Sequence, residues 1–450
     1  MHRCLCVDEI IRLVAHELVV LPKGRATAAS LACCCKSFED PVLDALWATQ
    51  SDILPLLRTL PDDIWNPGGH EVSATNTALV PHKLAQLFDL KCLKRPPTRQ
   101  EWGRLQKYAQ RMQTFRESLT MMCPLPSRVL SVLQFRSVNK PLLPNLKTLK
   151  LWSIRGDSIS LIPSFLSTRT TTIELSFLRS DADLVAVASM ITTFPTLCPN
   201  LQKIRLGDLP KDPVITSAVS ELLLTSNRNV LRYLLVDSPL TEEAREVMFK
   251  HPDLRKLSTV VDGSTPLFTM VLPNLTEMVL EFNHERDWLQ GFRGASLGKL
   301  VLVSFFSDSS SIGDFLEAFE SVTLTTSIPA TLSTFIFNTS RQWRPNYRSL
   351  LSFTRLVELT IDLSCEPSCS SRMDDDTVAE LAQAMPKLET LRIGESPCKT
   401  PGGITIEGLS AIAPFSASYP FTFNWLASTR HTSLNFLSLA NPLPCKWTAL

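Results

Sequence analysis

The sequence predicts an α/β protein: a short N-terminal domain of three helices, followed by an irregular solenoid of leucine-containing repeats. Two observations carry this prediction. Apolar residues recur at helical spacing within the first 60 residues, and a leucine pattern that ends in an alternating stretch recurs farther along the chain. With 450 residues, of which 44% are hydrophobic and 20% charged, the chain can bury a substantial core.

Residues 5–60 have the pattern of three short helices. The apolar residues of the first predicted helix share one face: Val7, Ile10, Ile11, Val14 and Leu18. Residues 21–24 break this helix, a second helix follows over residues 26–35, and a third begins at Asp40. Three short helices enclose a small core, so we expect a partner to complete this domain.

The next segment, residues 61–140, is predicted to link the helices to the repeats and to cap the repeat array. Turn residues flank a short helix over residues 79–93, and Thr98 and Glu101 then form the sequence signature of a capping box. Apolar residues follow at helical spacing: Trp102, Leu105, Tyr108, Ala109, Met112, Phe115 and Leu119. The opposite face carries Arg104, Lys107, Arg111 and Arg116. Such a face could bind phosphate or an acidic peptide, but we interpret it as a solvated surface.

The repeats share the pattern Leu-x-x-Leu-x-Leu, whose last two apolar positions alternate with polar ones, as a strand with one buried face requires. Five copies carry a proline lead-in, and their first leucines are Leu146, Leu201, Leu254, Leu275 and Leu388. Weaker copies start at Leu231, Leu297, Leu332, Leu356 and Leu434. Helical stretches separate most copies, and the spacing of roughly 21–35 residues overlaps the leucine-rich-repeat period of about 20–29.

These repeats are irregular, because the asparagine or cysteine expected after each strand is mostly absent, with Asn283 as the best match. The alternative is a generic α/β domain with scattered leucines. The recurring Pro-Asn or Pro-Asp lead-in favours the repeat array.

Charge and composition exclude several classes of protein. Lys and Arg number 45 against 44 Asp and Glu, so the net charge of +1 argues against a whole-chain nucleic-acid or membrane-surface protein. No apolar run reaches the length of about 18 residues that a membrane span needs. Asp8 and Glu9 argue against a signal peptide, so we expect reduced cysteines and a location in the cytoplasm, the nucleus or both.

Some clusters have the composition of metal or catalytic sites, but their spacing favours structural roles. Residues 33–35 are adjacent cysteines, which point in different directions from a helix. Cys365 and Cys369 lack a second pair at zinc-finger spacing, and residues 374–376 fit the start of a helix. The sequence contains no nucleotide-binding loop and no nucleophile–base arrangement, so we expect no metal, no cofactor and no enzymatic activity.

The N-terminal segment resembles an F-box. The resemblance rests on residues 8–11 (Asp-Glu-Ile-Ile), residues 31–38 (Leu-Ala-Cys-Cys-Cys-Lys-Ser-Phe) and residues 43–47 (Leu-Asp-Ala-Leu-Trp). The family pattern has an acidic and apolar first helix, a central L-x-x-V-C-K-x-W/F phrase and a closing Leu-Trp. Cys6 and Val7 stand where a leucine–proline pair usually opens the motif, and the loop around residues 22–27 is expected to be long.

An F-box followed by leucine-rich repeats is similar to a large group of fungal F-box proteins of the SCF substrate-receptor type. The resemblance implies a substrate-recognition subunit of a cullin–RING ubiquitin ligase, with a Skp-family adaptor bound to the F-box and a protein substrate on the concave repeat face. Neither a nucleic acid nor a membrane is expected as a partner. The implied adaptor-binding residues are Ile10, Leu13, Val14, Leu31, Phe38, Leu43, Leu46 and Trp47. The alternative is a repeat-based interaction scaffold with a degenerate F-box that joins no ligase.

Residues that alternate with the buried leucines are expected to face a substrate. The candidate substrate-binding residues are Lys150, Trp152, Lys203, Arg205, Glu277, Glu281, Glu358, Asp362 and Arg392. Their sign runs from basic to acidic along the array, although ordinary surface charge would also explain them. Trp152 is the best candidate anchor, because an aromatic residue on an exposed strand face is unusual.

The chain therefore divides into four predicted segments. These are residues 5–60 as an F-box-like helical domain, 61–140 as a linker and helical cap, 141–413 as a leucine-rich-repeat solenoid and 414–450 as an atypical C-terminal tail. Residues 414–425 of the tail are aromatic and proline-interrupted, and Leu434 begins one last repeat-like strand.

Overall fold

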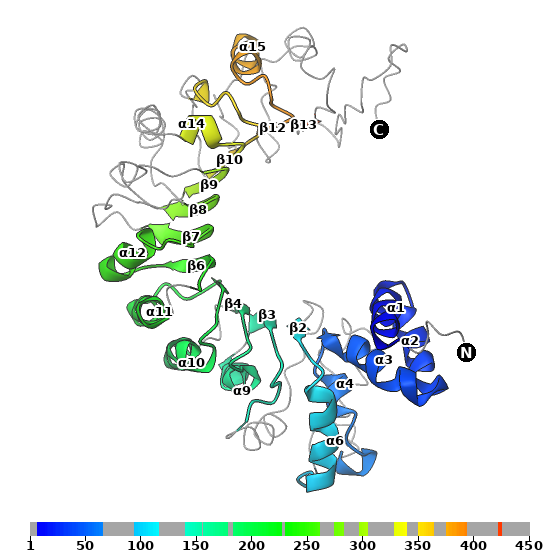
Figure 1. The fold of residues 1–450 in the computed structure, drawn as a ribbon. Helices are drawn as coiled ribbons and strands as arrows, with labels where there is room; N and C mark the ends of the chain where they lie inside the picture. The colour runs from blue at the N-terminus through cyan, green and yellow to red at the C-terminus, as the bar shows by residue number, and fades with distance from the viewer. Residues whose placement is uncertain are drawn as a thin grey trace, which may run out of the picture. The chain divides into compact units, whose positions relative to one another are not determined.

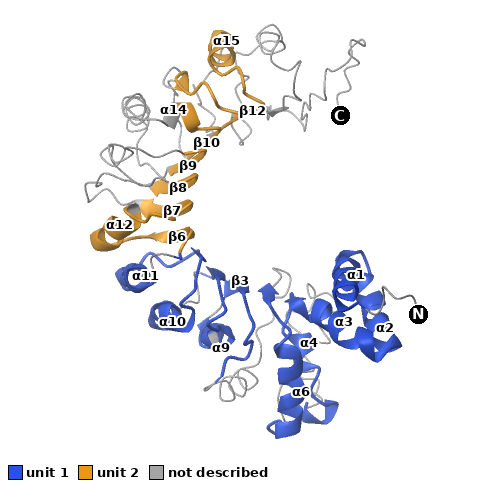
Figure 2. Ribbon diagram, viewed as in Figure 1, with its two compact units in different colours: residues 1–230 blue, residues 231–450 orange. Residues whose placement is uncertain are grey.

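Figure 1 shows a computed structural model of the chain. The structure describes residues 7–65, 94–116, 140–178 except 155, 183–226, 230–261, 274–282, 297–304, 328–339, 350–363, 375–393 and 422–424. The chain forms two compact units, unit 1 (residues 1–230) and unit 2 (residues 231–450), which Figure 2 distinguishes by colour. Among the described helices, none has the length and apolar character needed to cross a bilayer.

Unit 1 begins with three helices, as predicted: α1 (Asp8–Val20), α2 (Gly24–Cys34) and α3 (Lys36–Ala48). The third helix begins four residues before the predicted start at Asp40. Their shared core contains Ile11, Ala15, Ala28, Phe38, Val42 and Leu46. The loop between α1 and α2 is short, contrary to the prediction, because α2 begins at Gly24. Lys23 turns the chain with a φ of 64°, and a Cβ on Gly24 would lie 1.7 Å from the carbonyl oxygen of Leu18. Glycine is therefore required at this tight turn.

Short elements connect these helices to the strands: α4 (Leu54–Leu57), the 3-10 helix η2 (Asp62–Ile64) and α6 (Arg99–Ala109). The predicted capping box is present at the start of α6. The Thr98 backbone N–H donates to Glu101 over 2.6 Å, and the Glu101 backbone N–H donates to the Thr98 hydroxyl over 3.3 Å. The predicted helix over residues 79–93 lies outside the described residues.

The predicted continuation of α6 through Phe115 is wrong. The helix ends at Ala109, and Phe115 lies in strand β2 (Thr114–Arg116), directly opposite Leu149 of the next strand. Met112 and Phe115 are both buried and three residues apart. A spacing of three residues fits one face of a helix and also the start of the Leu-x-x-Leu pattern. Periodicity alone therefore did not distinguish a longer helix from the entry to a repeat strand.

Five parallel strands follow one another in unit 1: β1 (Thr49–Gln50), β2, β3 (Thr148–Ile154), β4 (Thr172–Phe177) and β5 (Lys203–Gly207). The helices after β3 are α8 (Gly156–Ile159), α9 (Ile162–Phe165), α10 (Leu184–Leu197) and α11 (Pro213–Thr225). Figure 1 shows α9, α10 and α11 along one side of these strands. This arrangement of parallel strands backed by helices is solenoid-like and resembles a leucine-rich-repeat fold.

Strand β4 belongs to a repeat that the leucine pattern did not identify. Thr170 occupies the position of the first leucine, ahead of the buried Ile173 and Leu175. Thr170 is fully buried, and its hydroxyl donates a 3.0 Å hydrogen bond to the carbonyl oxygen of Leu146. A threonine is tolerated there because the preceding repeat satisfies its polar atom.

Unit 2 also consists of parallel strands accompanied by helices. Its strands are β6 (Tyr233–Pro239), β7 (Lys256–Val261), β8 (Glu277–Phe282), β9 (Lys299–Ser304), β10 (Thr334–Thr339), β11 (Glu358–Leu363), β12 (Thr390–Ile393) and β13 (Thr422–Asn424). Its described helices are α12 (Glu242–Phe249), α14 (Ile328–Thr331) and α15 (Asp375–Ala384). The predicted leucines at residues 231–388 of this unit are buried, as the pattern requires.

Strand β13 lies within residues 414–450, where the sequence predicts no strand before Leu434. It pairs in parallel with β12. Leu434 and the candidate turn residue Asn283 lie outside the described residues. The predicted segment boundaries at residues 60, 140 and 413 stay predictions.

The asparagines of the lead-in have a common structural role. Asn145 donates to the carbonyl oxygen of Gln110 over 2.6 Å, and Asn200 donates to that of Thr168 over 3.1 Å. In unit 2, Asn274 donates to the carbonyl oxygen of Pro252 over 2.7 Å. Each bond joins the entry of one strand to the entry of the preceding strand, which explains why asparagine recurs there.

Candidate functional site

Helix α1 exposes one apolar side. The exposed residues are Val7, Ile10, Leu13, Val14, Val20 and Leu21, here called the α1 apolar face. Ile10, Leu13, Val14 and Val20 lie on one side of the helix, which also carries the exposed Glu17, while Val7 and Leu21 flank its two ends. Ile11 and Ala15, on the adjoining side, enter the helical core. Leu13 is 66% exposed. Ile10, Leu13 and Val14 are three of the predicted adaptor-binding residues, and all three lie on this face.

The other predicted adaptor-binding residues pack in or against the core of the three helices, or against α6. Phe38 and Leu46 are buried in the helical core, and Leu31 and Leu43 pack against it. Trp47 contacts Tyr108 of α6, with ring centroids 4.8 Å apart. The predicted set therefore divides into exposed residues on α1 and residues that hold the three helices together or join them to α6.

Part of the basic side of α6 contacts α3, which differs from the predicted solvated surface. Arg111, whose side chain is only 12% exposed, forms ion pairs with Asp40 and Asp44. It also donates to the backbone carbonyl of Asp40 over 3.1 Å. Lys107 lies 3.8 Å from Glu39. Arg111 thus fixes the N-terminal helices onto the start of the strand array, a role that no local sequence pattern reveals.

The solvent-facing side of the unit 1 strands is organised around Glu174. One carboxylate oxygen of Glu174 lies 3.0 Å from Nζ of Lys150 and 2.7 Å from Nζ of Lys203. The side chain of Glu174 is 4% exposed. Burial by itself raises the pKa of Glu174, but the hydrogen bonds from Lys203 and Lys150 outweigh it and hold the pKa below its usual range.

The same side brings Trp152 and Arg205 together. The guanidinium carbon of Arg205 lies 5.5 Å from the centroid of the Trp152 ring, which is cation–π distance. Strand register places Arg116, Lys150, Glu174 and Arg205 in one row across β2–β5. The predicted residues Lys150, Trp152, Lys203 and Arg205 therefore form one cluster, and the role of Trp152 as an anchor for a partner stays a prediction.

Glu174 was absent from the predicted site because its repeat lacks the first leucine. The signal that could have identified it is the buried pattern Ile173-x-Leu175, which places Glu174 on the solvent side of a strand. Its two lysine partners lie 24 and 29 residues away in the sequence, a separation at which no periodicity predicts a pair.

Replacing Glu174 by glutamine is expected to lower the free energy of unfolding at pH 7 by about 1–2 kcal/mol, because two ion pairs to a buried carboxylate are lost. The folded-state pKa lies below the unfolded value of about 4.3, so this contribution is complete above that pH and disappears as pH falls through the folded-state pKa. Urea unfolding should therefore show a difference in free energy of unfolding between wild type and Glu174→Gln that disappears at acidic pH. A difference that stays constant from neutral to acidic pH would contradict this prediction.

The solvent-facing side of the unit 2 strands has a different chemistry. Glu277 lies 2.7 Å from Nζ of Lys256 and 3.9 Å from Nζ of Lys299, so charges alternate across β7, β8 and β9. The next row of the same face is largely apolar and half-buried, with Leu235, Val279, Val301 and Ile336 in register. Glu277 is neutralised by its neighbours, so the predicted run from basic to acidic charge is interrupted here.

The remaining predicted substrate-binding residues are distributed over unit 2. Glu281 lies on β8, Glu358 and Asp362 on β11, and Arg392 on β12, where it is opposite Thr360. Arg392 is exposed. These residues lie on the same series of parallel strands as Glu277.

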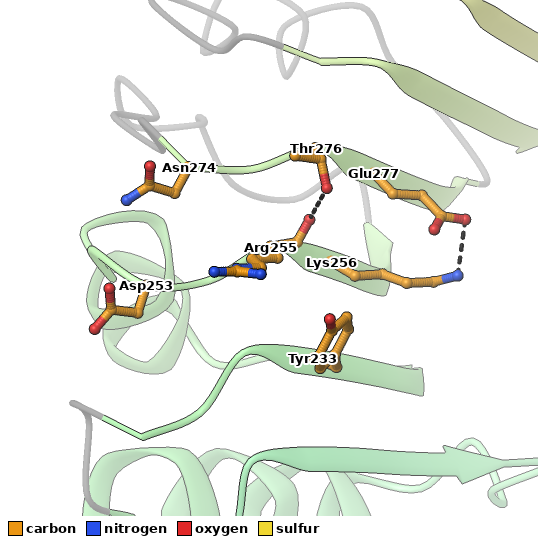
Figure 3. A pocket seen from close by; sticks show the side chains of 7 residues that line it. All are labelled: Tyr233, Asp253, Arg255, Lys256, Asn274, Thr276 and Glu277. Carbon is orange, nitrogen blue, oxygen red and sulfur yellow. Dashed lines mark hydrogen bonds and ion pairs between the residues drawn. The ribbon is translucent and has the colours of Figure 1, made fainter.

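A small polar pocket of about 430 Å³ lies at the start of β6–β8 (Figure 3). Its lining residues are Tyr233, Asp253, Arg255, Lys256, Asn274, Thr276 and Glu277. The Thr276 hydroxyl donates to the carbonyl oxygen of Arg255 over 3.1 Å, and Figure 3 shows this bond beside the Lys256–Glu277 ion pair. The pocket contains both charge signs, which suits polar groups of a protein partner.

Within the described ranges, no three His, Cys, Asp or Glu side chains lie close enough to hold a metal ion. Cys33 and Cys34 are exposed, and Cys35 is half-buried. Burial raises the pKa of Cys198 to about 12, so this thiol stays protonated at neutral pH. Cys365, Cys369 and Asp374 lie outside the described residues.

Models of known protein families give no match to this chain, and neither do curated protein sequences. Among solved structures, the chain is similar to the LRR ectodomain of the plant membrane receptor kinase GASSHO1/SCHENGEN3 from Arabidopsis thaliana, solved in complex with CASPARIAN STRIP INTEGRITY FACTOR 2. The similarity has 13% sequence identity and a TM-score of 0.30 and covers 71% of this chain. It spans 33% of the receptor chain, about one third of its length.

Proposed function

We propose that this chain is a non-catalytic protein-interaction receptor whose N-terminal helices dock on a Skp-family adaptor and whose strand faces bind a protein substrate for a cullin–RING ubiquitin ligase. The observation that carries the proposal is the α1 apolar face. It lies on the segment whose sequence resembles an F-box, and its exposed residues include three that the resemblance assigns to adaptor binding.

The physical argument concerns exposed apolar surface. Large aliphatic side chains grouped on one exposed face are unfavourable in water and mark interaction sites in soluble proteins. The rest of the three-helix domain is small, and its core consists of a few residues between α1, α2 and α3. A partner that covers the α1 apolar face would remove this surface from water and enlarge the core.

The strand faces of each unit support a second binding function. The strand faces present side chains in fixed register, with paired charges in unit 1 and an apolar row in unit 2. Surfaces of this kind suit protein partners, because extended rows of polar and apolar groups match another folded or extended chain. The competing proposal is a scaffold that uses these strand faces but does not join a ligase.

Adaptor capture separates the two proposals. The full chain is co-expressed with a tagged Skp-family adaptor, and the wild type is expected to co-purify with it. Leu13→Asp combined with Val14→Asp is expected to weaken capture at least about 100-fold, because two buried apolar contacts become charged groups at an interface. The measurement is the adaptor dissociation constant by isothermal titration, with circular dichroism to check folding.

The matched control is Val185→Asp. Val185 lies on α10 of the same unit and is 72% exposed, so it receives one such aspartate at an apolar site that is at least as exposed. Adaptor affinity should be unchanged in this variant. Leu46→Ala is unsuitable as a test, because Leu46 lies in the helical core and its loss would affect folding. Failure of the folded wild type to bind any Skp-family adaptor would favour the scaffold.

A further inference from the structure

The solvent-facing side of the unit 1 strands concentrates positive charge, and we infer that it binds an extended acidic segment of a partner protein. The inference rests on the proposed function, in which strand faces hold a protein partner, and adds the chemistry of that partner. The residues are Arg116, Lys150, Lys203 and Arg205, here called the basic strand face. Within the described strands β1–β5, Glu174 is the sole acidic residue, and Asp208 follows β5.

The spacing of the basic strand face fits an extended chain. Arg116, Lys150 and Arg205 share one row through Glu174, and Lys203 joins the row through its ion pair with Glu174. Adjacent strands lie about 4.8 Å apart, so four strands span about 14 Å. An extended peptide rises about 3.3 Å per residue and crosses this distance in about five residues. Acidic side chains at alternate positions would meet successive basic groups.

The cations are held in place before a partner arrives. Glu174 fixes the ammonium groups of Lys150 and Lys203 at 3.0 and 2.7 Å, and Trp152 supports the guanidinium of Arg205 at 5.5 Å. One carboxylate shared by two lysines leaves a surplus positive charge. Side chains that are already ordered lose less conformational entropy when they bind, which favours an acidic ligand.

The position of the aromatic ring argues against a nucleic acid as the occupant. Single-stranded nucleic acids bind basic grooves whose aromatic side chains are free to stack with bases. Here the Trp152 ring already contacts Arg205.

Fluorescence anisotropy with the full chain, without adaptor, tests the inference. The probe is a labelled peptide of about ten residues with alternating glutamate and serine, matched by a peptide with glutamine in place of glutamate. We expect the acidic peptide to bind at least about tenfold more tightly at physiological salt, and Arg205→Glu to reduce its affinity at least about tenfold. Arg205→Gln should reduce it by a smaller factor, which preserves the test if the charge reversal impairs folding.

The matched control is Arg104→Glu, a charge reversal at an exposed residue of α6 in the same unit, which should leave peptide affinity unchanged. Equal binding of the two peptides, or equal weakening by Arg104→Glu and Arg205→Glu, would overturn the inference. Tighter binding of an oligothymidine that is lost in Arg205→Glu would also overturn it, by identifying a nucleic-acid site. Adaptor capture is measured separately, so either proposal can fail while the other stands.

Discussion

Phe335→Ala is expected to lower the free energy of unfolding of unit 2 by about 3–5 kcal/mol, the usual cost of deleting a buried aromatic ring. Phe335 takes the second leucine position of its repeat and is fully buried. Its ring stacks on that of Phe353 with centroids 6.2 Å apart and an interplanar angle of 6°. The truncation would leave a cavity between β10 and the turn before β11.

This effect should be greatest near the altered repeat. In a solenoid each repeat contacts mainly its neighbours, so β9 and β11 should lose more protection than the strands farther away. Amide hydrogen exchange monitored strand by strand, together with urea unfolding, measures both the size and the extent of the change. Uniform loss of protection throughout unit 2 would contradict nearest-neighbour coupling.

The matched control is Ile336→Ala at the adjacent residue. Ile336 is half-buried and lies on the opposite side of β10, in register with Val301 and Thr360. Truncation there should cost less than about 1 kcal/mol, because the side chain is already partly in water. Equal costs for Phe335→Ala and Ile336→Ala would show that the alternation of buried and solvent-facing residues is wrong for this strand.

Arg111→Ala has the second largest expected effect and should lower the free energy of unfolding by about 2–3 kcal/mol. The guanidinium joins Asp40 and Asp44 of α3 to the end of α6, and it is nearly buried. Without it, the α3–α6 contact retains the Trp47–Tyr108 ring pair. We expect α1–α3 to exchange their amide hydrogens faster, while β4 and β5 stay protected.

Two further variants separate geometry from charge. Arg111→Lys keeps the positive charge, but lysine lacks the planar fork of donors that reaches two carboxylates. Its free energy of unfolding should therefore lie between those of wild type and Arg111→Ala. Arg104→Ala removes an exposed arginine from α6, the helix that precedes Arg111, and should change stability by less than about 0.5 kcal/mol. Equal destabilisation by Arg104→Ala and Arg111→Ala would contradict the role assigned to the α3–α6 ion pairs.

These variants also bear on function. If Arg111 couples the N-terminal helices to the strands, its loss should leave the α1 apolar face able to bind an adaptor but less firmly attached to the strand faces. The two proposed binding functions, adaptor docking and recognition of an acidic segment, could then be weakened independently through Leu13 and Arg205.

Local sequence patterns predicted most of the repeat strands, but not β2, β4 or β13, and they predicted the three N-terminal helices. Buried leucines such as Leu146 and Leu275 report a strand entry directly, because the spacing of Leu-x-x-Leu-x-Leu is fixed by the turn and by the two-residue period of a strand. The capping box at Thr98 could also be predicted from the sequence, since both of its hydrogen bonds lie within four consecutive residues.

The tertiary structure decided what depends on distant partners. Phe115 became part of a strand because a neighbouring strand pairs with it, and Thr170 replaced a leucine because the preceding repeat accepts its hydroxyl hydrogen bond. Glu174 and Arg111 acquired their partners from strands and helices far away in the sequence. Periodicity describes one element at a time, whereas burial, ion pairing and exposure are set by which elements pack together, and for that reason only the folded chain showed which side of α1 stays open.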